Sequence, residues 1–267
     1  MKKQSIAFIG AGNMARAIIA GLLKTDVDPK RIWASSPTIL SRAPLSVHVT
    51  TDNFEAAKQA DIIVLGVKPW AIEALCQELK SIIHEKKPLI ISLAAGVKTE
   101  SIARFCEAEN IALVRTMPNI ASAVGAGVTG LFANAFVTSE QKTAADNLFQ
   151  SVGSTVWVEE ENQLDVITVI SGSGPAYFFY FFEAMQATAE SLGLSSEKAK
   201  ALVAATAQGA AKMVMERAEP FMELRRQVTS EKGVTAAATS VFDENKVKEI
   251  IDTAMRAALT RAQELAK

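Results

Sequence analysis

A glycine-rich turn near the start of the chain has the spacing of a phosphate-binding loop. Gly10, Gly12 and Ala15 form a G-x-G-x-x-A pattern between a short apolar run and a segment of helical period. Gly10 permits a tight turn, Gly12 lets a pyrophosphate approach the backbone, and Ala15 is small enough for close packing of helix on strand. The N–H groups and positive dipole end of that helix would face the phosphates. The pattern therefore predicts dinucleotide binding.

The residues after the second apolar run bear on which dinucleotide binds. An acidic side chain there would hold the ribose 2′-hydroxyl of NAD, but the chain has Ser35, Ser36, Pro37 and Thr38 instead. Two hydroxyls and backbone N–H groups suit a 2′-phosphate, and Arg42 is a more distant candidate contact. The sequence thus favours NADP (as NADPH), with NAD possible. The alternative is a plain Ser-Pro loop, with the cofactor decided elsewhere.

Three further loops follow apolar runs and should reach the same edge of a sheet, where ligands bind; they are residues 66–70, 92–97 and 115–119. Small residues in the second loop, Ala94, Ala95 and Gly96, would let a nicotinamide ring lie against the backbone. Lys68 is either a ligand contact or an ordinary surface lysine. Asn119 is either a ligand contact or a helix cap or turn residue.

The elements that would position these loops change character near residue 160. Before it, apolar runs alternate with helical segments, which predicts a parallel sheet with helices on both faces. The predicted strands are residues 5–9, 31–35, 62–67, 89–93, 112–116, 125–132 and 155–158, and the predicted helices are 13–24, 54–59, 70–84, 99–107 and 139–151.

After residue 160, long helical periods rich in alanine replace the strands. The predicted helices are residues 161–171, 175–192, 195–217, 234–242 and 245–266. We therefore predict an α/β Rossmann-type N-terminal domain over residues 1–160, followed by an all-α C-terminal domain over residues 161–267. Alanine-rich helices of this kind pack closely and often pair with a second copy.

Composition excludes several classes of function. The net charge is −1 with both signs mixed along the chain, which predicts no nucleic-acid partner. The longest apolar stretch, residues 166–189, is interrupted by glycines, a proline and a glutamate, and no signal peptide is recognisable, so we expect a soluble, cytoplasmic protein without a membrane partner. Cys76 and Cys106 lie in helix-like stretches with no close partner along the sequence, and two buried thiols are expected in preference to the alternative, a disulfide. With only His48 and His84, neither a Ser-His-Asp triad nor a multi-histidine metal site is expected.

A series of short motifs resembles the pyrroline-5-carboxylate reductase family. They are G-A-G-N-M-A at 10–15, V-K-P at 67–69, A-A-G-V at 94–97, M-P-N at 117–119, S-G-S-G-P-A-Y at 171–177 and V-T-S-E-K-G-V-T at 228–235. The resemblance covers nearly the whole chain, and the last two motifs are specific to this family. It implies reduction of 1-pyrroline-5-carboxylate to L-proline with NADPH or NADH, the last step of proline biosynthesis. It also implies a helical domain that forms a homodimer, which in some relatives stacks into a decamer, a ring of five dimers.

The resemblance also implies roles for individual residues. Those expected to line the dinucleotide, including the loop residues considered above, are Ile9, Gly10, Ala11, Gly12, Asn13, Met14, Ser35, Ser36, Asn53, Val67, Lys68, Pro69, Ala94, Ala95, Gly96 and Asn119. Those expected near the substrate are Glu161, Ser230, Gly233, Val234 and Thr235.

Within the substrate set we expect Thr235 to hydrogen-bond the ring nitrogen. Ser230 and the backbone N–H groups near Gly233 would hold the carboxylate. Thr235 has a rival interpretation as a helix N-cap. Glu161 also has one, because it ends an acidic run, E-E-E, of the kind that is usually solvated and favoured by a helix dipole. A protonated cyclic iminium is already a good electrophile, so no strong general acid is required.

Two local features of the sequence qualify the resemblance. Lys232 stands where the family usually has a glycine, and if that position needs a positive φ angle, the lysine costs backbone strain. The aromatic run at 177–182 predicts a helix buried all round, which the resemblance assigns to the subunit contact. The preceding Gly172 and Gly174 are expected in a turn beside the substrate pocket.

Two other functions remain open on the sequence. The first is reduction of a different imine, ketone or hydroxy acid on the same two-domain plan. Hydroxy-acid members would need a catalytic lysine on the helical domain; Lys198, Lys200 and Lys212 are available but stand in no matching motif. The second is a non-catalytic dinucleotide-binding or sensing protein.

Overall fold

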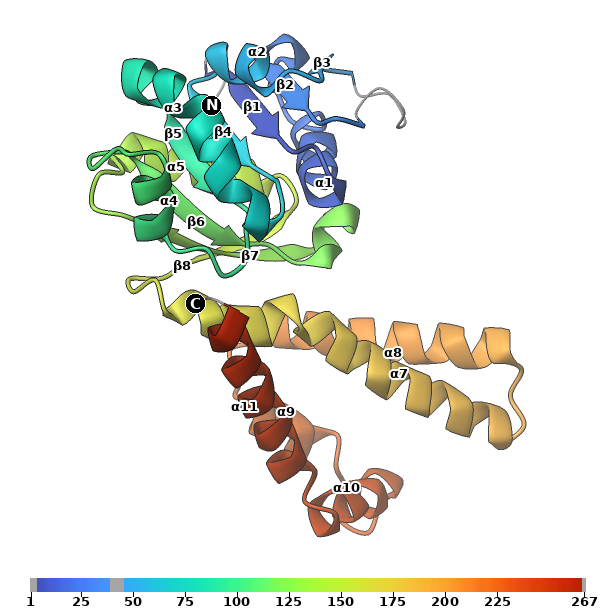
Figure 1. Cartoon of the computed structure of the whole chain (residues 1–267). Helices are drawn as coiled ribbons and strands as arrows, with labels where there is room; N and C mark the ends of the chain where they lie inside the picture. Colours follow the sequence, from blue (N-terminus) through green and yellow to red (C-terminus); the bar gives the residue numbers. More distant parts are fainter. Residues whose placement is uncertain (1–3, 39–45, 266–267) are drawn as a thin grey trace. The chain divides into compact units, whose positions relative to one another are not determined.

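The computed structural model describes residues 4–38 and 46–265, and its contacts divide the chain into two compact units (Figure 1). The first unit contains Met1–Ser173 and Ala258–Lys267, and the second contains Gly174–Ala257. Arg42, a candidate phosphate contact, lies outside the described residues.

The first unit is built on an eight-stranded sheet in the order β3-β2-β1-β4-β5-β6-β7-β8. From β1 the sheet is built outward through β2 and β3 on one side, and the chain then returns to place β4 on the other side of β1. Dinucleotides bind at this reversal in proteins of this architecture. The strands are β1 (Ile6–Ile9), β2 (Ile32–Ser35), β3 (His48–Thr50), β4 (Ile62–Leu65), β5 (Leu89–Ser92), β6 (Leu113–Met117), β7 (Gly127–Ala133) and β8 (Gly153–Trp157).

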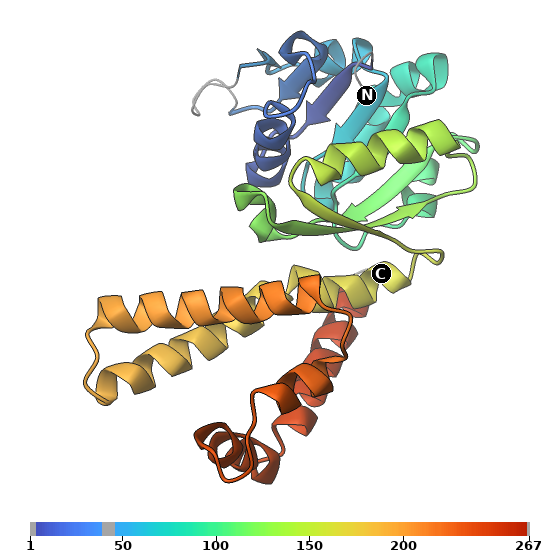
Figure 2. The same ribbon diagram turned by 180° about the vertical axis from the view of Figure 1, so that it is seen from behind.

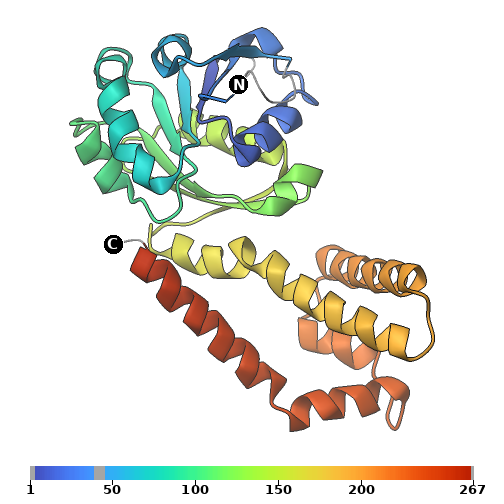
Figure 3. The ribbon, with the colours of Figure 1, turned by 45° about the vertical axis from the view of Figure 1, so that its right-hand side comes forward.

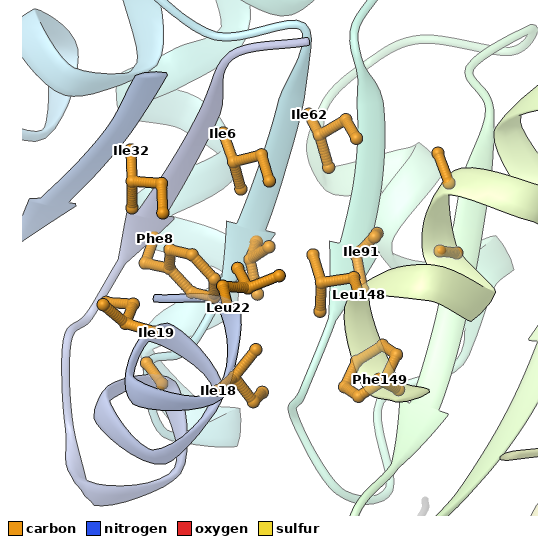
Figure 4. Packing of buried hydrophobic residues seen from close by; sticks show 14 of the residues in the cluster. Ile6, Phe8, Ile18, Ile19, Leu22, Ile32, Ile62, Ile91, Leu148 and Phe149 are labelled. Carbon is orange, nitrogen blue, oxygen red and sulfur yellow. The ribbon is translucent and has the colours of Figure 1, made fainter. Parts of the chain in front are cut away.

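Helices cover both faces of this sheet, because side chains that alternate along each strand are apolar on both sides. Ile6 and Phe8 of β1 face the cluster under α1 and α5, whereas Ala7 and Ile9 face the cluster under α2, α3 and α4. Figure 4 shows Phe8 among side chains of α1 and α5, and Figure 2 shows α5 across that face of the sheet. The helices are α1 (Asn13–Leu22), α2 (Asn53–Lys58), α3 (Ile72–Lys86), α4 (Thr99–Phe105) and α5 (Ser139–Gln150).

The predicted parallel sheet contains one antiparallel pair of strands. β6 and β7 run antiparallel, with Met117 opposite Gly130, while the other pairs between neighbouring strands are parallel. The connection between them holds only a short 3-10 turn, η4 (Ile120–Val124), and no crossover helix. A parallel pair needs a longer connection, so the chain turns back instead. The edge strand β3 was not predicted, because its three residues are largely exposed and carry no apolar run.

The second unit consists of helices. α7 and α8 run side by side as an antiparallel pair (Figure 3). The short helix α9 was not predicted; the others lie close to their predicted ranges. The helices are α7 (Gly174–Ser191), α8 (Ser196–Glu216), α9 (Phe221–Gln227), α10 (Val234–Glu244) and α11 (Val247–Leu265), the last of which continues beyond the unit.

The aromatic run of α7 is not buried all round within one chain. Phe178, Phe179 and Tyr180 are 63%, 61% and 75% exposed, and exposed large hydrophobic residues recur along α8 and α11. Large exposed apolar patches on a single copy are typical of interaction surfaces. The burial expected for these aromatic residues is therefore absent within the single chain.

One helix ends and the next begins within the S-G-S-G segment, as expected: the helical segment before it ends at Gly172, Ser173 is a bend, and α7 begins at Gly174. α6 (Gln163–Ile167) passes directly into a single π-helical turn, η5 (Thr168–Gly172). A Cβ atom on Gly172 would lie 2.7 Å from the Met117 side-chain methyl, so glycine allows the close approach to β6. α6 packs against β6 and β7, so this segment belongs to the first unit by its contacts; the sequence boundary at residue 160 stays a prediction.

The expectation of two buried thiols rather than a disulfide is confirmed. Cys76 of α3 and Cys106 after α4 are both buried free thiols that lie close to each other. The neighbouring Cys76 thiol and burial raise the pKa of Cys106 well above its usual range. α3 and α4 pack side by side, which brings together residues 30 positions apart. Among the described helices, none is both long enough and apolar enough to cross a membrane.

Candidate functional site

The glycine loop leaves the end of β1 in a conformation that only glycine adopts readily. Gly10 has φ +90°, and a Cβ atom there would lie 2.7 Å from the backbone nitrogen of Val67. The N–H groups of Gly10 and Ala11 both donate to the Ser35 carbonyl at 2.9 Å. The loop is therefore fixed by the neighbouring strands β2 and β4 rather than by its own side chains.

Gly12 lies at the point where a ligand would meet α1. It is the N-cap residue and has no side chain with which to cap the helix. A Cβ atom on Gly12 would contact only the Gly10 carbonyl oxygen, at 3.9 Å, so the backbone faces open space. The positive end of the α1 dipole faces that space. Ala15, predicted to allow close packing, is 1% exposed. These residues fit a dinucleotide pyrophosphate.

The loop after β4 lies against the glycine loop. The Gly66 N–H donates to the Ile9 carbonyl at 2.7 Å, and a Cβ atom on Gly66 would lie 2.6 Å from the Gly10 carbonyl oxygen. Val67 is half-buried and Lys68 is exposed at this edge. The structure thus brings the V-K-P motif beside the glycine loop, as the strand order requires, while a contact of Lys68 with a cofactor stays a prediction.

The loop after β5 presents a small-residue surface at the same edge. Ala94 is buried and donates its N–H to the Ser92 hydroxyl at 3.2 Å, Ala95 is exposed, and Gly96 has φ +78°. Thr116 of β6 donates its hydroxyl to the Ser92 carbonyl at 2.9 Å, which fixes the loop's start. A flat ligand could lie against this backbone without meeting a large side chain.

The end of β2 is organised by a chain of side-chain hydrogen bonds. The Ser35 hydroxyl, fully buried, donates to Asn53 Oδ1 at 2.8 Å, and Asn53 Nδ2 donates to Glu78 Oε2 at 3.1 Å. Ser36 is 9% exposed, and Thr38 beyond it is exposed. Ser35 therefore braces the loop through its hydroxyl and carbonyl, and a direct contact with a cofactor stays a prediction. Sequence reasoning missed Glu78, which lies on α3 in no motif.

Asn119 uses both ends of its side-chain amide within the protein. Its Nδ2 donates to the Ser171 carbonyl at 3.0 Å, and its Oδ1 accepts from the Val128 N–H at 3.2 Å. The residue is 7% exposed. Asn119 therefore has a structural role, because it links the M-P-N loop to the S-G-S-G segment. Its contact with a cofactor stays a prediction.

Glu161 lies in a partly buried network of charged side chains. Its carboxylate accepts from the Thr99 N–H and hydroxyl, both at 2.8 Å, and from Arg115 Nη1 at 3.2 Å. Arg115 also contacts Asp165 Oδ1 through Nη2 at 3.4 Å, and its side chain is only 5% exposed. Thr99 begins α4, just after the A-A-G-V loop. Glu161 thus ties that loop to β6 and is not the solvated helix start that its acidic neighbours suggest.

The 228–235 stretch, in the second unit, forms the turn that starts α10. Gly233 is the N-cap residue and donates its N–H to the Ser230 carbonyl at 3.0 Å. Thr235 is exposed in the first turn of α10, so its interpretation as the N-cap is wrong. Lys232 has φ +59°, which confirms that the position the family fills with glycine is left-handed. Such a conformation costs a non-glycine residue about 1 kcal/mol or more.

Two family models match the chain. A model described as pyrroline-5-carboxylate reductase dimerisation matches residues 161–265. A model described as NADP oxidoreductase, coenzyme F420-dependent, matches residues 5–96, which contain the glycine loop. The two matches correspond to the predicted order of a dinucleotide-binding half followed by a dimerising half.

Full-length relatives and solved structures agree with these models. A pyrroline-5-carboxylate reductase from Vibrio alginolyticus is 42% identical over 272 residues, covering 100% of this chain and 99% of that protein. One from Pseudomonas aeruginosa is 41% identical, with 100% and 98% covered. The solved structure of a pyrroline-5-carboxylate reductase from Coxiella burnetii has a TM-score of 0.92 at 42% identity, with 99% of each chain covered. A Plasmodium falciparum pyrroline carboxylate reductase solved with NADP bound has a TM-score of 0.89 at 27% identity, with 100% of each chain covered.

Proposed function

The chain belongs to the pyrroline-5-carboxylate reductase family, and we propose how its own residues carry out the reduction of 1-pyrroline-5-carboxylate to L-proline in proline biosynthesis. The observation that supports this function most directly is the similarity to reductases over their full length, at 42% and 41% identity. The chain is accordingly an oxidoreductase with an N-terminal NADP-binding Rossmann-type half and a helical dimerisation half.

NADP is the cofactor, and the glycine loop has the shape to hold its pyrophosphate. When bound, NADPH supplies the hydride that adds to C5 of the cyclic imine. We propose that Ser36 and Asn53 hold the adenosine ribose and its 2′-phosphate. Ala95 and Gly96 would support the nicotinamide ring, because their loop offers backbone without large side chains. NADH is the proposed weaker alternative.

The substrate contacts are proposed for the turn that starts α10. Ser230 and the N–H groups at the start of α10 would hold the substrate carboxylate, since Gly233 leaves that helix end without a side-chain cap. The Thr235 hydroxyl is exposed and would accept a hydrogen bond from the protonated ring nitrogen. The substrate would arrive as the iminium ion, so this chain needs only to orient it, and orientation can lower a barrier by several kcal/mol.

The dimerisation model and the exposed apolar face of the second unit support a homodimer. We propose that both chains complete each active site and that five dimers form a decameric ring. Light scattering of the purified protein distinguishes the dimer from the decamer, and a stable, active monomer would contradict interleaved subunits. We retain the predicted cytoplasmic location as part of the proposal.

Thr235→Ala tests the catalytic assignment. Loss of the hydroxyl should lower kcat at least tenfold, by about 1.4 kcal/mol or more of barrier, while the Kd for NADPH stays within about twofold. Thr143→Ala is the matched control, because that exposed hydroxyl donates only to the Ser139 carbonyl of its own helix. Wild-type turnover in the Thr235 variant would refute the role.

A further inference from the structure

Glu78 carries a carboxylate to the site where the cofactor's ribose is expected. Asn53 begins α2 just beyond the end of β3, and its amide lies beside the end of β2, where its Oδ1 accepts from Ser35 at 2.8 Å. The other end of that amide donates to Glu78 Oε2 at 3.1 Å. Glu78 lies on the exposed side of α3, so its position is set by Asn53 and not by the core.

The end of β2 is where proteins of this architecture distinguish NAD from NADP. A carboxylate there accepts hydrogen bonds from the ribose hydroxyls, and it repels a 2′-phosphate. β2 itself ends in Ser35 and Ser36, without an acidic residue. The structure supplies the missing carboxylate from α3, one amide group away from the expected ribose contact.

We propose that Glu78 is a cofactor-specificity residue, which weakens binding of a 2′-phosphate and so narrows the preference for NADPH over NADH. The inference rests on the proposed roles of Ser36 and Asn53 at the ribose. A single negative charge, separated by the Asn53 amide from the expected site of a doubly charged phosphate, changes the affinity for that phosphate by roughly threefold to tenfold after solvent screening. The effect should shrink as the salt concentration rises.

The test uses ligands that carry only the adenosine end of the cofactor. We would measure the Kd of the full-length protein for adenosine 2′,5′-bisphosphate and for ADP by calorimetry at low ionic strength. Glu78→Gln keeps an oxygen that can accept from Asn53 and removes the charge. The Glu78→Gln substitution should lower the Kd for the bisphosphate by about threefold to tenfold. The Kd for ADP should change less than twofold. Glu85→Gln, an equal charge change on the exposed side of the same helix, should change neither Kd.

The outcomes separate the possible failures. No change for either ligand, or equal changes for both, would overturn the role of Glu78. The ratio of kcat/KM for NADPH to that for NADH should rise by the same factor as the bisphosphate affinity. If the wild-type protein turns over neither cofactor with pyrroline-5-carboxylate, the proposed function fails, while the calorimetry still decides on Glu78.

Discussion

Replacing Glu161 with glutamine tests whether this residue holds the structure or contacts the substrate. The carboxylate accepts three hydrogen bonds, two from Thr99 and one from Arg115, whose side chain is 5% exposed. Glutamine keeps one acceptor oxygen but turns an NH₂ group toward donors. It also leaves Arg115 with Asp165 as its remaining carboxylate in this network.

The expected cost follows from these contacts. Breaking a buried ion pair by removing one partner costs about 3–5 kcal/mol. This cost is reduced here because Arg115 retains its contact with Asp165 and because the Glu161 side chain is 18% exposed. We expect a loss of about 2–3 kcal/mol in the free energy of unfolding, or a fall of roughly 5–10 °C in Tm for a chain of this size.

Urea unfolding followed by circular dichroism measures this loss, at one fixed protomer concentration because the protein dimerises. Glu160→Gln is the matched control, since that side chain is exposed and outside the network. Because Glu161 also anchors Thr99 next to the A-A-G-V loop, its loss should raise the Kd for NADPH. Wild-type stability with a raised KM for pyrroline-5-carboxylate alone would refute the structural role.

Two further substitutions test the backbone conformations. Gly10→Ala places a Cβ atom 2.7 Å from the Val67 backbone nitrogen at φ +90°, so NADPH affinity should fall at least tenfold in a fluorescence titration; unchanged affinity would refute the loop assignment. Lys232→Gly removes a left-handed lysine at φ +59° and should stabilise the protein by up to about 1 kcal/mol in thermal unfolding, whereas a lower Tm would mean the lysine side chain has a stabilising role.

The sequence predicted the parts of the site that depend on local chain geometry. The apolar run before Gly10, the glycine spacing and the following helix all belong to one continuous segment, so their arrangement is encoded in sequence order. The positive φ at Lys232 had been considered only as a condition, from the glycine that the family usually has there, and the structure fulfils that condition at φ +59°.

Features that depend on packing between distant segments were not predictable. The Asn53 amide meets Glu78 only because α2 packs on α3, and Cys76 meets Cys106 only because α3 packs on α4. Glu161 looked solvated beside two other glutamates, yet it accepts from Thr99, 62 residues away. The reversal of β7 depended on a short connection whose 3-10 turn has no clear sequence signal.

The most direct test of the account is whether the purified protein oxidises NADPH when pyrroline-5-carboxylate is added. We predict a fall in nicotinamide absorbance with one L-proline formed per NADPH consumed. Tight binding of NADPH without oxidation, or oxidation only with a different imine, ketone or hydroxy acid, would contradict the account.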